Sequence, residues 1–154
     1  MLTQACRDYE PWGFIRQAWA SEKKEGRASA EARLQRINEI ADPVAKLSDH
    51  KLQAIASKLR GFSRSGAALD DYLVEAFALV REASRRVLGL YHYDVQLLGG
   101  LAICDGTIAE MATGEGKTLV QSLAAFTRSL SGRGVHVATA DSYLAERDFE
   151  FARP

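Results

Sequence analysis

The stretch Gly114-Glu115-Gly116-Lys117-Thr118 constrains this chain most, because a short apolar run precedes it and a segment of helical composition follows it. The apolar run covers residues 107–111, and the helical segment covers residues 117–130 and stops before Gly132. Glycines let a loop turn its backbone N–H groups toward phosphate oxygens, and the following helix adds the positive end of its dipole. The sequence therefore predicts a phosphate-binding loop between a strand and a helix.

Two side chains of this loop carry the expected chemistry. Lys117 would reach the β and γ phosphates of a nucleoside triphosphate, and Thr118 would hold Mg²⁺ through its hydroxyl. The full phosphate-loop pattern begins with a glycine where this chain has Met111, which narrows the prediction to helicase-like loops. The structural alternative is a glycine turn with a solvated lysine. The complete set of expected phosphate contacts is Thr113, Gly114, Glu115, Gly116, Lys117 and Thr118.

Up to about residue 90 the apolar residues recur at helical spacing and β-branched residues are few. We expect one helix over residues 28–40 and a second that Ser48 caps and Gly61 ends. A third helix should be capped by Asp70 or Asp71 and end at Gly89. Its expected buried face comprises Leu73, Phe77, Val80, Val87 and Leu88, and its expected solvent face comprises Arg81, Arg85 and Arg86.

Beyond residue 90 the pattern alternates between strand and helix. Residues 107–111 and 135–139 predict strands, and Asp141 should cap a further helix. Residues 96–105 either close a hairpin or end a short helix. We expect His136 to pack within the second strand rather than to take part in catalysis. Strand, helix and strand in this order predict a βαβ unit of a parallel sheet.

Composition excludes several classes of protein. The 154 residues carry 20 Lys and Arg against 20 Asp and Glu, whereas a protein that wraps nucleic acid needs a basic excess. No run approaches the roughly 18 apolar residues that a membrane span needs, and the first twenty residues lack the apolar region of a signal peptide. We therefore expect the chain to start in the cytoplasm. Cys6 and Cys104 lack the spacing of metal ligands.

Four runs of residues resemble one family: HYDVQLLGG at 92–100, IAEMATGEGKT at 108–118, GVHVAT at 134–139 and YLAERD at 143–148. Together with residues 75–83 and 86–89, they resemble the start of the first nucleotide-binding domain of SecA, the preprotein translocase ATPase. The likeness covers about residues 46–150. It implies an α/β fold in which N-terminal helices precede the start of a RecA-like, helicase-like parallel sheet, left incomplete by truncation of the chain after its second strand.

The resemblance also implies an organisation and a site. Residues 1–45 would be an N-terminal helical extension and residues 46–154 the nucleotide-binding domain, helical over 46–104 and βαβ over 105–154. Gln96 would read the adenine of ATP, because an amide matches the donor and acceptor of that base. Tyr93 would lie near the base, and Arg147 would be a nucleotide-site or coupling residue. The implied cofactors are ATP and Mg²⁺.

Partners follow from the same resemblance. SecA-type motors couple ATP hydrolysis to the export of unfolded preproteins through the SecYEG channel, which implies a cytoplasmic protein peripheral to the inner face of the membrane. Trp12, Ile15 and Trp19 share one helical face near basic residues, so this segment either touches acidic lipid or docks on its own domain. A homodimer is a further expectation, and a nucleic acid partner is not.

Hydrolysis needs an acidic residue after a further strand and a positive group for the transition state, and the chain has no Asp-Glu pair at the end of an apolar run. We therefore expect ATP binding without efficient hydrolysis. The unpaired edges of an unfinished sheet predict marginal stability or association. Two alternatives stay open: a standalone, non-catalytic module that binds nucleotide or the channel, and a fragment of a nucleic-acid helicase, which the neutral charge disfavours.

Overall fold

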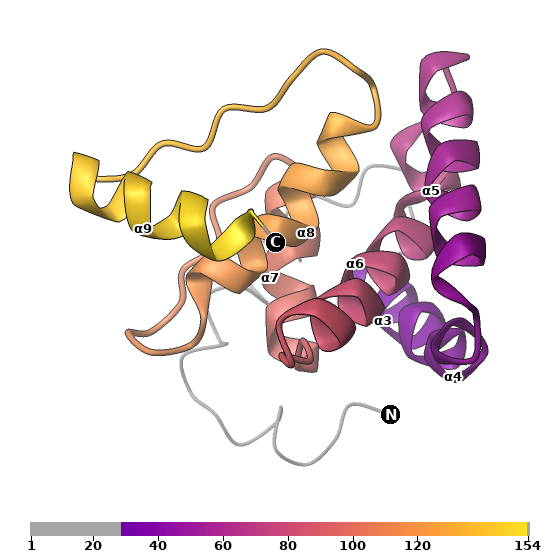
Figure 1. Ribbon diagram of the computed structural model, residues 1–154, viewed down its shortest axis with the longest axis horizontal. Coiled ribbons are helices and arrows are strands. Elements are labelled where there is room, and N and C mark those ends of the chain that lie inside the picture. Colours follow the sequence, from indigo (N-terminus) through magenta and orange to yellow (C-terminus); the bar gives the residue numbers. More distant parts are fainter. Residues whose placement is uncertain (1–28, 154) are drawn as a thin grey trace.

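The computed structural model describes residues 29–153, so the predicted segment around Trp12 and Trp19 lies outside the described residues. The elements are α3 (Ala30–Glu39), α4 (Ala41–Ala45), α5 (Asp49–Arg64), the 3-10 turn η1 (Leu69–Asp71), α6 (Leu73–Val87), α7 (Asp94–Cys104), α8 (Lys117–Ser129) and α9 (Ser142–Ala152). Helix α6 contacts α3, α4, α5 and α8, and α7 packs against α8 and α3. Figure 1 shows α9 on the opposite side of this bundle from α5.

Two helices start at the capping residues that the sequence predicts. The prediction that Asp70 or Asp71 caps α6 is wrong, because the N-cap of α6 is Tyr72, without a side-chain cap, and Asp71 instead accepts a hydrogen bond from the Ala68 N–H before η1. The Ser48 hydroxyl accepts a hydrogen bond from the Lys51 N–H, and the Asp141 carboxylate accepts one from the Leu144 N–H at 2.8 Å. Gly61 does not end its helix, because it lacks the positive φ that terminates a helix, and α5 continues to Arg64. The chain instead turns at Gly66, where φ is 93°.

Helix α6, the third predicted helix, differs from its prediction on both the buried face and the solvent face. Val87 was expected in the core but is 58% exposed, and Arg81 was expected in solvent but is 6% exposed. The Arg81 side chain crosses to neighbouring elements, where its Nε donates to the His92 carbonyl at 2.9 Å and its Nη1 donates to Asn38 at 2.5 Å. Arg81 is buried although the helical pattern predicts its exposure, because these hydrogen bonds offset the cost of removing the guanidinium from water.

One apolar core holds α3, α6, α7 and α8 together. Its residues are Ala30, Leu34, Ile37, Leu73, Val74, Phe77, Leu97, Leu101, Cys104, Leu123 and Ala124. Helix α7 approaches its neighbours closely because it carries Gly99 and Gly100 where they meet. A Cβ on Gly100 would lie 3.0 Å from Phe77 Cε1 and 3.0 Å from Leu123 Cδ1. This packing fixes the position of the first turn of α8, which follows the glycine loop.

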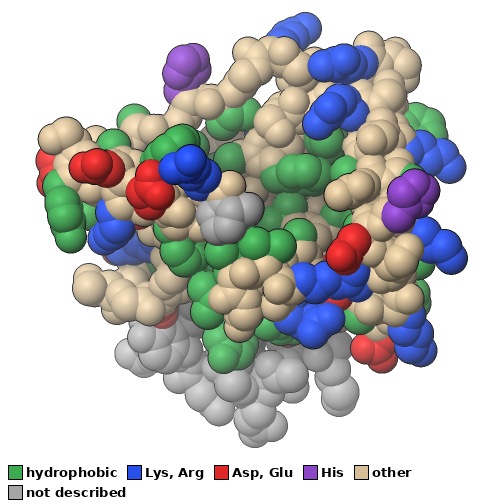
Figure 2. Space-filling view, in the orientation of Figure 1, with side chains coloured by type: hydrophobic (Ala, Val, Ile, Leu, Met, Phe, Trp, Pro, Cys, Tyr) green, Lys and Arg blue, Asp and Glu red, His purple; other side chains and the backbone are tan. Residues whose placement is uncertain are grey.

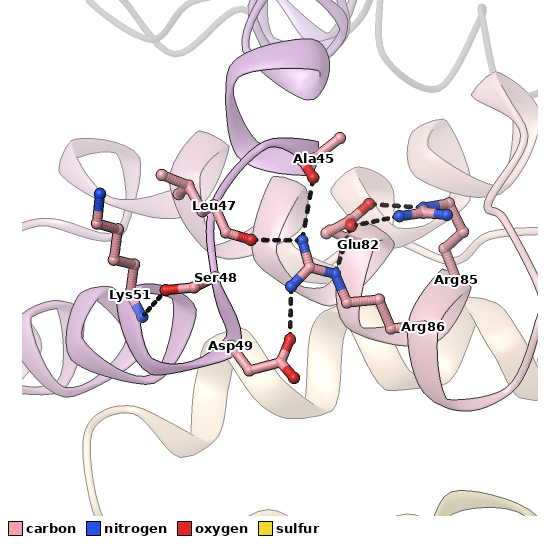
Figure 3. Close-up of polar contacts among 8 residues, drawn as sticks. All are labelled: Ala45, Leu47, Ser48, Asp49, Lys51, Glu82, Arg85 and Arg86. Atoms are coloured by element: carbon pink, nitrogen blue, oxygen red, sulfur yellow. Dashed lines mark hydrogen bonds and ion pairs between the residues drawn. The ribbon is translucent and has the colours of Figure 1, made fainter.

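Arg86 ties α6 to the junction between α4 and α5 (Figure 3). Its guanidinium donates to Glu82 at 2.6 Å, to Asp49 at 2.5 Å, and to the backbone carbonyls of Ala45 and Leu47. Arg85 binds the same Glu82 carboxylate, which is 4% exposed. Hydrogen bonds from Arg85, and then from Arg86, hold the pKa of Glu82 below its ordinary value although burial opposes them.

The two predicted strands are not formed within residues 29–153. Segments 107–112 and 134–139 run without secondary structure, and no ladder joins them to each other or to another described segment. Ile108 and Val137 remain in solvent, 84% and 53% exposed, whereas Met111 is buried at 8% exposure, beside Gly99 of α7. The prediction that His136 packs in a strand is wrong, since His136 is exposed. A strand needs a partner backbone, which an apolar pattern alone does not provide.

Of the alternating strands and helices predicted beyond residue 90, the structure therefore confirms the helices and not the sheet. Residues 96–105, for which the sequence left two alternatives, lie in α7 and the turn after it. None of the helices between residues 29 and 153 has the length and apolarity to cross a bilayer.

Figure 2 shows hydrophobic side chains in the middle of one face, between α9 and α5, and basic side chains toward α5. The exposed cations of α5 are Lys51, Lys58, Arg60 and Arg64.

Candidate functional site

A pocket of about 560 Å³ lies where the loop between α6 and α7 meets the first turns of α7 and α8 and one side of α9. Its lining comprises Gly89, Leu90, Tyr91, Tyr93, Gln96, Gly116, Thr118, Leu119, Arg147, Asp148 and Phe151. Five residues predicted for the nucleotide site are in this set: Tyr93, Gln96, Gly116, Thr118 and Arg147. The other four do not line it: Thr113 and Gly114 in the glycine loop and Lys117 at the start of α8 are exposed, and Glu115 is half-buried.

The glycine loop has the backbone that its sequence predicts. Gly114 and Gly116 both have positive φ, 91° and 78°, which side-chain-bearing residues rarely adopt. The Glu115 carboxylate accepts a hydrogen bond from the Ala112 N–H at 2.8 Å and so closes the turn. Gly116 is the N-cap of α8 and has no side chain that could accept hydrogen bonds from the first turn. The positive end of the helix dipole therefore faces the loop without a capping side chain from Gly116.

Gln96 joins α7 to this loop. Its Oε1 accepts a hydrogen bond from the Tyr93 N–H at 3.0 Å, and its Nε2 donates to the Glu115 carbonyl at 3.0 Å. The side chain is 7% exposed. A primary amide has a second N–H and a second lone pair, so Gln96 keeps one donor and one acceptor for a ligand after making these two contacts.

Helix α9 contributes Arg147 and Asp148 to the pocket. The Thr118 hydroxyl donates to Asp148 Oδ1 at 3.3 Å, and Arg147 donates to the same oxygen through Nε at 3.0 Å and Nη2 at 2.7 Å. Sequence reasoning singled out Thr118 and Arg147 but gave Asp148 no role. Its signal in the sequence is an acidic residue directly after the predicted site arginine.

A buried histidine contacts Leu119, one of the residues that line the pocket. His92 is fully buried, and its Nε2 lies 3.0 Å from the Leu119 carbonyl oxygen in the first turn of α8. Burial, aided by the charge of Arg81 and opposed by the Leu119 contact, lowers the pKa of His92. The neutral imidazole therefore donates to Leu119, while Nδ1 has no hydrogen-bond partner among the described residues.

Arg81 contacts the loop between α6 and α7 through His92 and Tyr91. Its guanidinium carbon lies 4.1 Å from the centre of the Tyr91 ring, and it pairs with Asp94 at 3.5 Å. Burial lowers the pKa of Arg81, and Tyr91 and Asp94 oppose that effect. Tyr91, which lines the pocket, thus has a fixed cation over its ring. No sequence pattern pointed to Arg81, because the helical spacing placed it in solvent.

Comparison with known proteins identifies the family. The sequence model described as SecA DEAD-like domain matches residues 15–154, so the chain belongs to this family. The description DEAD-like implies an α/β, helicase-like domain, of which the described residues display the helices and not the sheet.

Curated relatives agree with this assignment. The chain is 54% identical over 117 residues to protein translocase subunit SecA 2 of Bacillus thuringiensis (strain Al Hakam), an alignment that covers 76% of the chain and 15% of the relative. It is 52% identical over 120 residues to SecA of Carboxydothermus hydrogenoformans, covering 78% of the chain and 14% of the relative. The SecA of Thermosynechococcus vestitus is 56% identical over 115 residues, an alignment that covers 75% of the chain and 12% of the relative. The chain thus spans a small part of the length of these relatives.

Proposed function

We propose that the chain is the ATP-binding portion of a SecA-type translocase motor. The observation that carries this proposal is the pocket itself: residues from as far apart in the chain as Gly89 and Phe151 line one cavity, at the N-terminus of α8. Gln96 and Tyr93 come from the start of α7, Gly116 and Thr118 from the glycine loop and α8, and Arg147 from α9. A helix N-terminus with a glycine loop suits a phosphate group, and an amide suits a base.

Each group has a defined part in this proposal. The amide of Gln96, with Tyr93 beside it, binds the adenine, and the backbone of residues 113–117 with Lys117 binds the phosphates. Thr118 fits Mg²⁺, because the ion prefers oxygen ligands and the Thr118 hydroxyl lines the pocket at the helix start. Bound Mg²⁺ would neutralise the charge of the β and γ phosphates. Arg147 adds a positive charge at the same end of the pocket.

In the whole motor, binding at this site would drive preprotein export through the SecYEG channel at the inner face of the cell membrane. The relatives are named protein translocase subunits, which supports this part of the proposal. The 154 residues contain no Asp-Glu pair at the end of an apolar run to activate water. We therefore infer that this chain by itself binds ATP and Mg²⁺ without efficient hydrolysis.

Titration of the purified chain with a fluorescent ATP analogue and Mg²⁺ tests the proposal. We expect saturable binding that Lys117→Ala weakens by about tenfold or more, because a charged contact to phosphate is lost. Lys51→Ala is the matched control, since Lys51 is an exposed lysine of α5 that does not line the pocket. Absence of saturable binding, or equal binding by Lys117→Ala, would refute the proposal. Turnover of ATP that Lys117→Ala abolishes would refute the inference about hydrolysis.

A further inference from the structure

We propose that Asp148 is a second protein ligand of the Mg²⁺ ion and acts together with Thr118. This inference rests on the proposed function, because it concerns the cation that accompanies the bound nucleotide. It goes beyond that function by assigning the ion a carboxylate ligand from α9, an element outside the glycine loop.

The first observation is the distance between the two oxygens. Thr118 Oγ1 lies 3.3 Å from Asp148 Oδ1. Two neighbouring ligands in the octahedron that Mg²⁺ prefers lie about 3 Å apart. The hydroxyl and the carboxylate are therefore already close to the separation that one shared ion requires. Mg²⁺ in nucleotide sites is commonly bound through one or two carboxylates together with phosphate oxygens.

The second observation is the partial burial of this carboxylate on a mostly exposed helix. The Asp148 side chain is 14% exposed, whereas that of Arg147 is 52% exposed and Phe149 is 63% exposed. Among the described residues, the hydrogen bonds to Asp148 from Thr118 and Arg147 all end on Oδ1. Because the second carboxylate oxygen, Oδ2, receives none of them, the Asp148 carboxylate as a whole keeps lone pairs with which to bind an ion that Thr118 also contacts.

The charges around the pocket favour a cation at Asp148. Asp148 lines the same pocket as Gly116 and Thr118, where the proposed function places the phosphates. A carboxylate beside a triphosphate is repelled unless a cation lies between them. Arg147 already pairs with Asp148 and offsets part of its charge. A divalent ion between Asp148 and the phosphates converts the remaining repulsion into attraction, so Asp148 makes binding depend on Mg²⁺.

The test measures nucleotide affinity rather than turnover. The dissociation constant of a fluorescent, non-hydrolysable ATP analogue is determined for the full 154-residue chain with Mg²⁺ and with EDTA, and the ratio of the two constants gives the Mg²⁺ dependence. We expect Asp148→Asn to reduce this ratio by about tenfold, as removal of a partner of a metal site does. In EDTA the same variant should bind as well as the unchanged chain or better, because the repulsion is gone.

Two further variants test whether the effect is specific to the carboxylate of Asp148. Glu146→Gln is the matched control, because Glu146 is an exposed acidic residue of α9 outside the pocket, and it should keep the ratio of the unchanged chain. Asp148→Glu should restore part of the Mg²⁺ dependence. Circular dichroism confirms that each variant folds. Electron paramagnetic resonance of Mn²⁺ used in place of Mg²⁺ should show fewer bound ions for Asp148→Asn than for Glu146→Gln at the same nucleotide saturation.

The outcomes separate the two proposals. An Asp148→Asn variant whose ratio equals that of the unchanged chain overturns the role of Asp148 and leaves ATP binding intact. Tighter binding by Asp148→Asn in both buffers, to the same extent, also overturns it, because Asp148 would then only repel the nucleotide. Absence of saturable binding by the unchanged chain in either buffer overturns the proposed function, and this inference with it.

Discussion

The side-chain amide of Gln96 donates a hydrogen bond to the carbonyl oxygen of Glu115 at 3.0 Å, which joins the first turn of α7 to the loop that begins α8. The amide nitrogen also lies 2.5 Å from the position that a Cβ on Gly116 would take. The rotamer of Gln96 and the conformation of the glycine loop therefore depend on each other. Any ligand that contacts the amide also acts on the loop.

Gly116→Ala should weaken nucleotide binding more than Gly114→Ala. Both substitutions place a side chain at positive φ, at a cost of roughly 1–2 kcal/mol. A Cβ at position 116 also collides with Gln96, whereas a Cβ at position 114 meets nothing within 4 Å. Titration of both variants with the fluorescent ATP analogue checks the order. Equal affinities would mean that the contact between Gln96 and the loop does not matter for binding.

Gly100→Ala should lower the free energy of unfolding by about 1–3 kcal/mol, because a methyl group enters a packed core. The new Cβ would lie 3.0 Å from both Phe77 and Leu123. Gly61→Ala is the matched substitution within α5, where a Cβ meets nothing within 4 Å, and it should raise stability by about 0.5–1 kcal/mol. Urea denaturation of the two variants gives both values. Unchanged or raised stability of Gly100→Ala would contradict the close packing of α7.

Arg86→Gln should lower the melting temperature more than Arg85→Gln. Arg86 binds Glu82, Asp49 and two backbone carbonyls, whereas the described contacts of Arg85 are with Glu82 alone (Figure 3). Removing Arg86 thus separates α6 from the α4–α5 junction and leaves carbonyl groups without their donor. Thermal unfolding monitored by circular dichroism compares the two. A larger effect from Arg85→Gln would contradict the role of Arg86 in joining α6 to the α4–α5 junction.

Stability should fall on acidification below about pH 6.5, partly because of His92. Burial lowers the pKa of His92 in the folded state, so the unfolded chain takes up this proton at a higher pH than the folded chain. The contribution is present above the ordinary histidine pKa and is lost as the pH falls through the lowered value. Melting temperatures of the chain and of His92→Gln, measured from about pH 7.5 to 5, should show a flatter profile for the variant.

His50→Gln is the control for this experiment. His50 is exposed on α5, so its replacement should leave the pH profile of the chain unchanged. A His92→Gln profile as steep as that of the unchanged chain would assign the acid sensitivity to other groups.

Five of the nine residues that the sequence predicts for the nucleotide site line the pocket, namely Tyr93, Gln96, Gly116, Thr118 and Arg147, and their binding role stays a prediction. They could be found because a glycine loop before a helix and a family resemblance both leave local signals. Asp148 could not be assigned in this way. Its place depends on how α9 lies against the first turn of α8, and nothing within a few residues of Asp148 encodes that contact.

The sequence by itself determined several of the described helices and the turn residues of the glycine loop. Ser48 and Asp141 cap the helices that follow them, and Gly114 and Gly116 allow the loop, because each acts on neighbouring backbone within a few positions. The tertiary structure alone decided the burial of Arg81, the absence of ladder pairing between the described extended segments, and the contact of Asp148 with Thr118. Those features require partners distant along the chain, and periodicity records which residues are apolar but not which partners they meet.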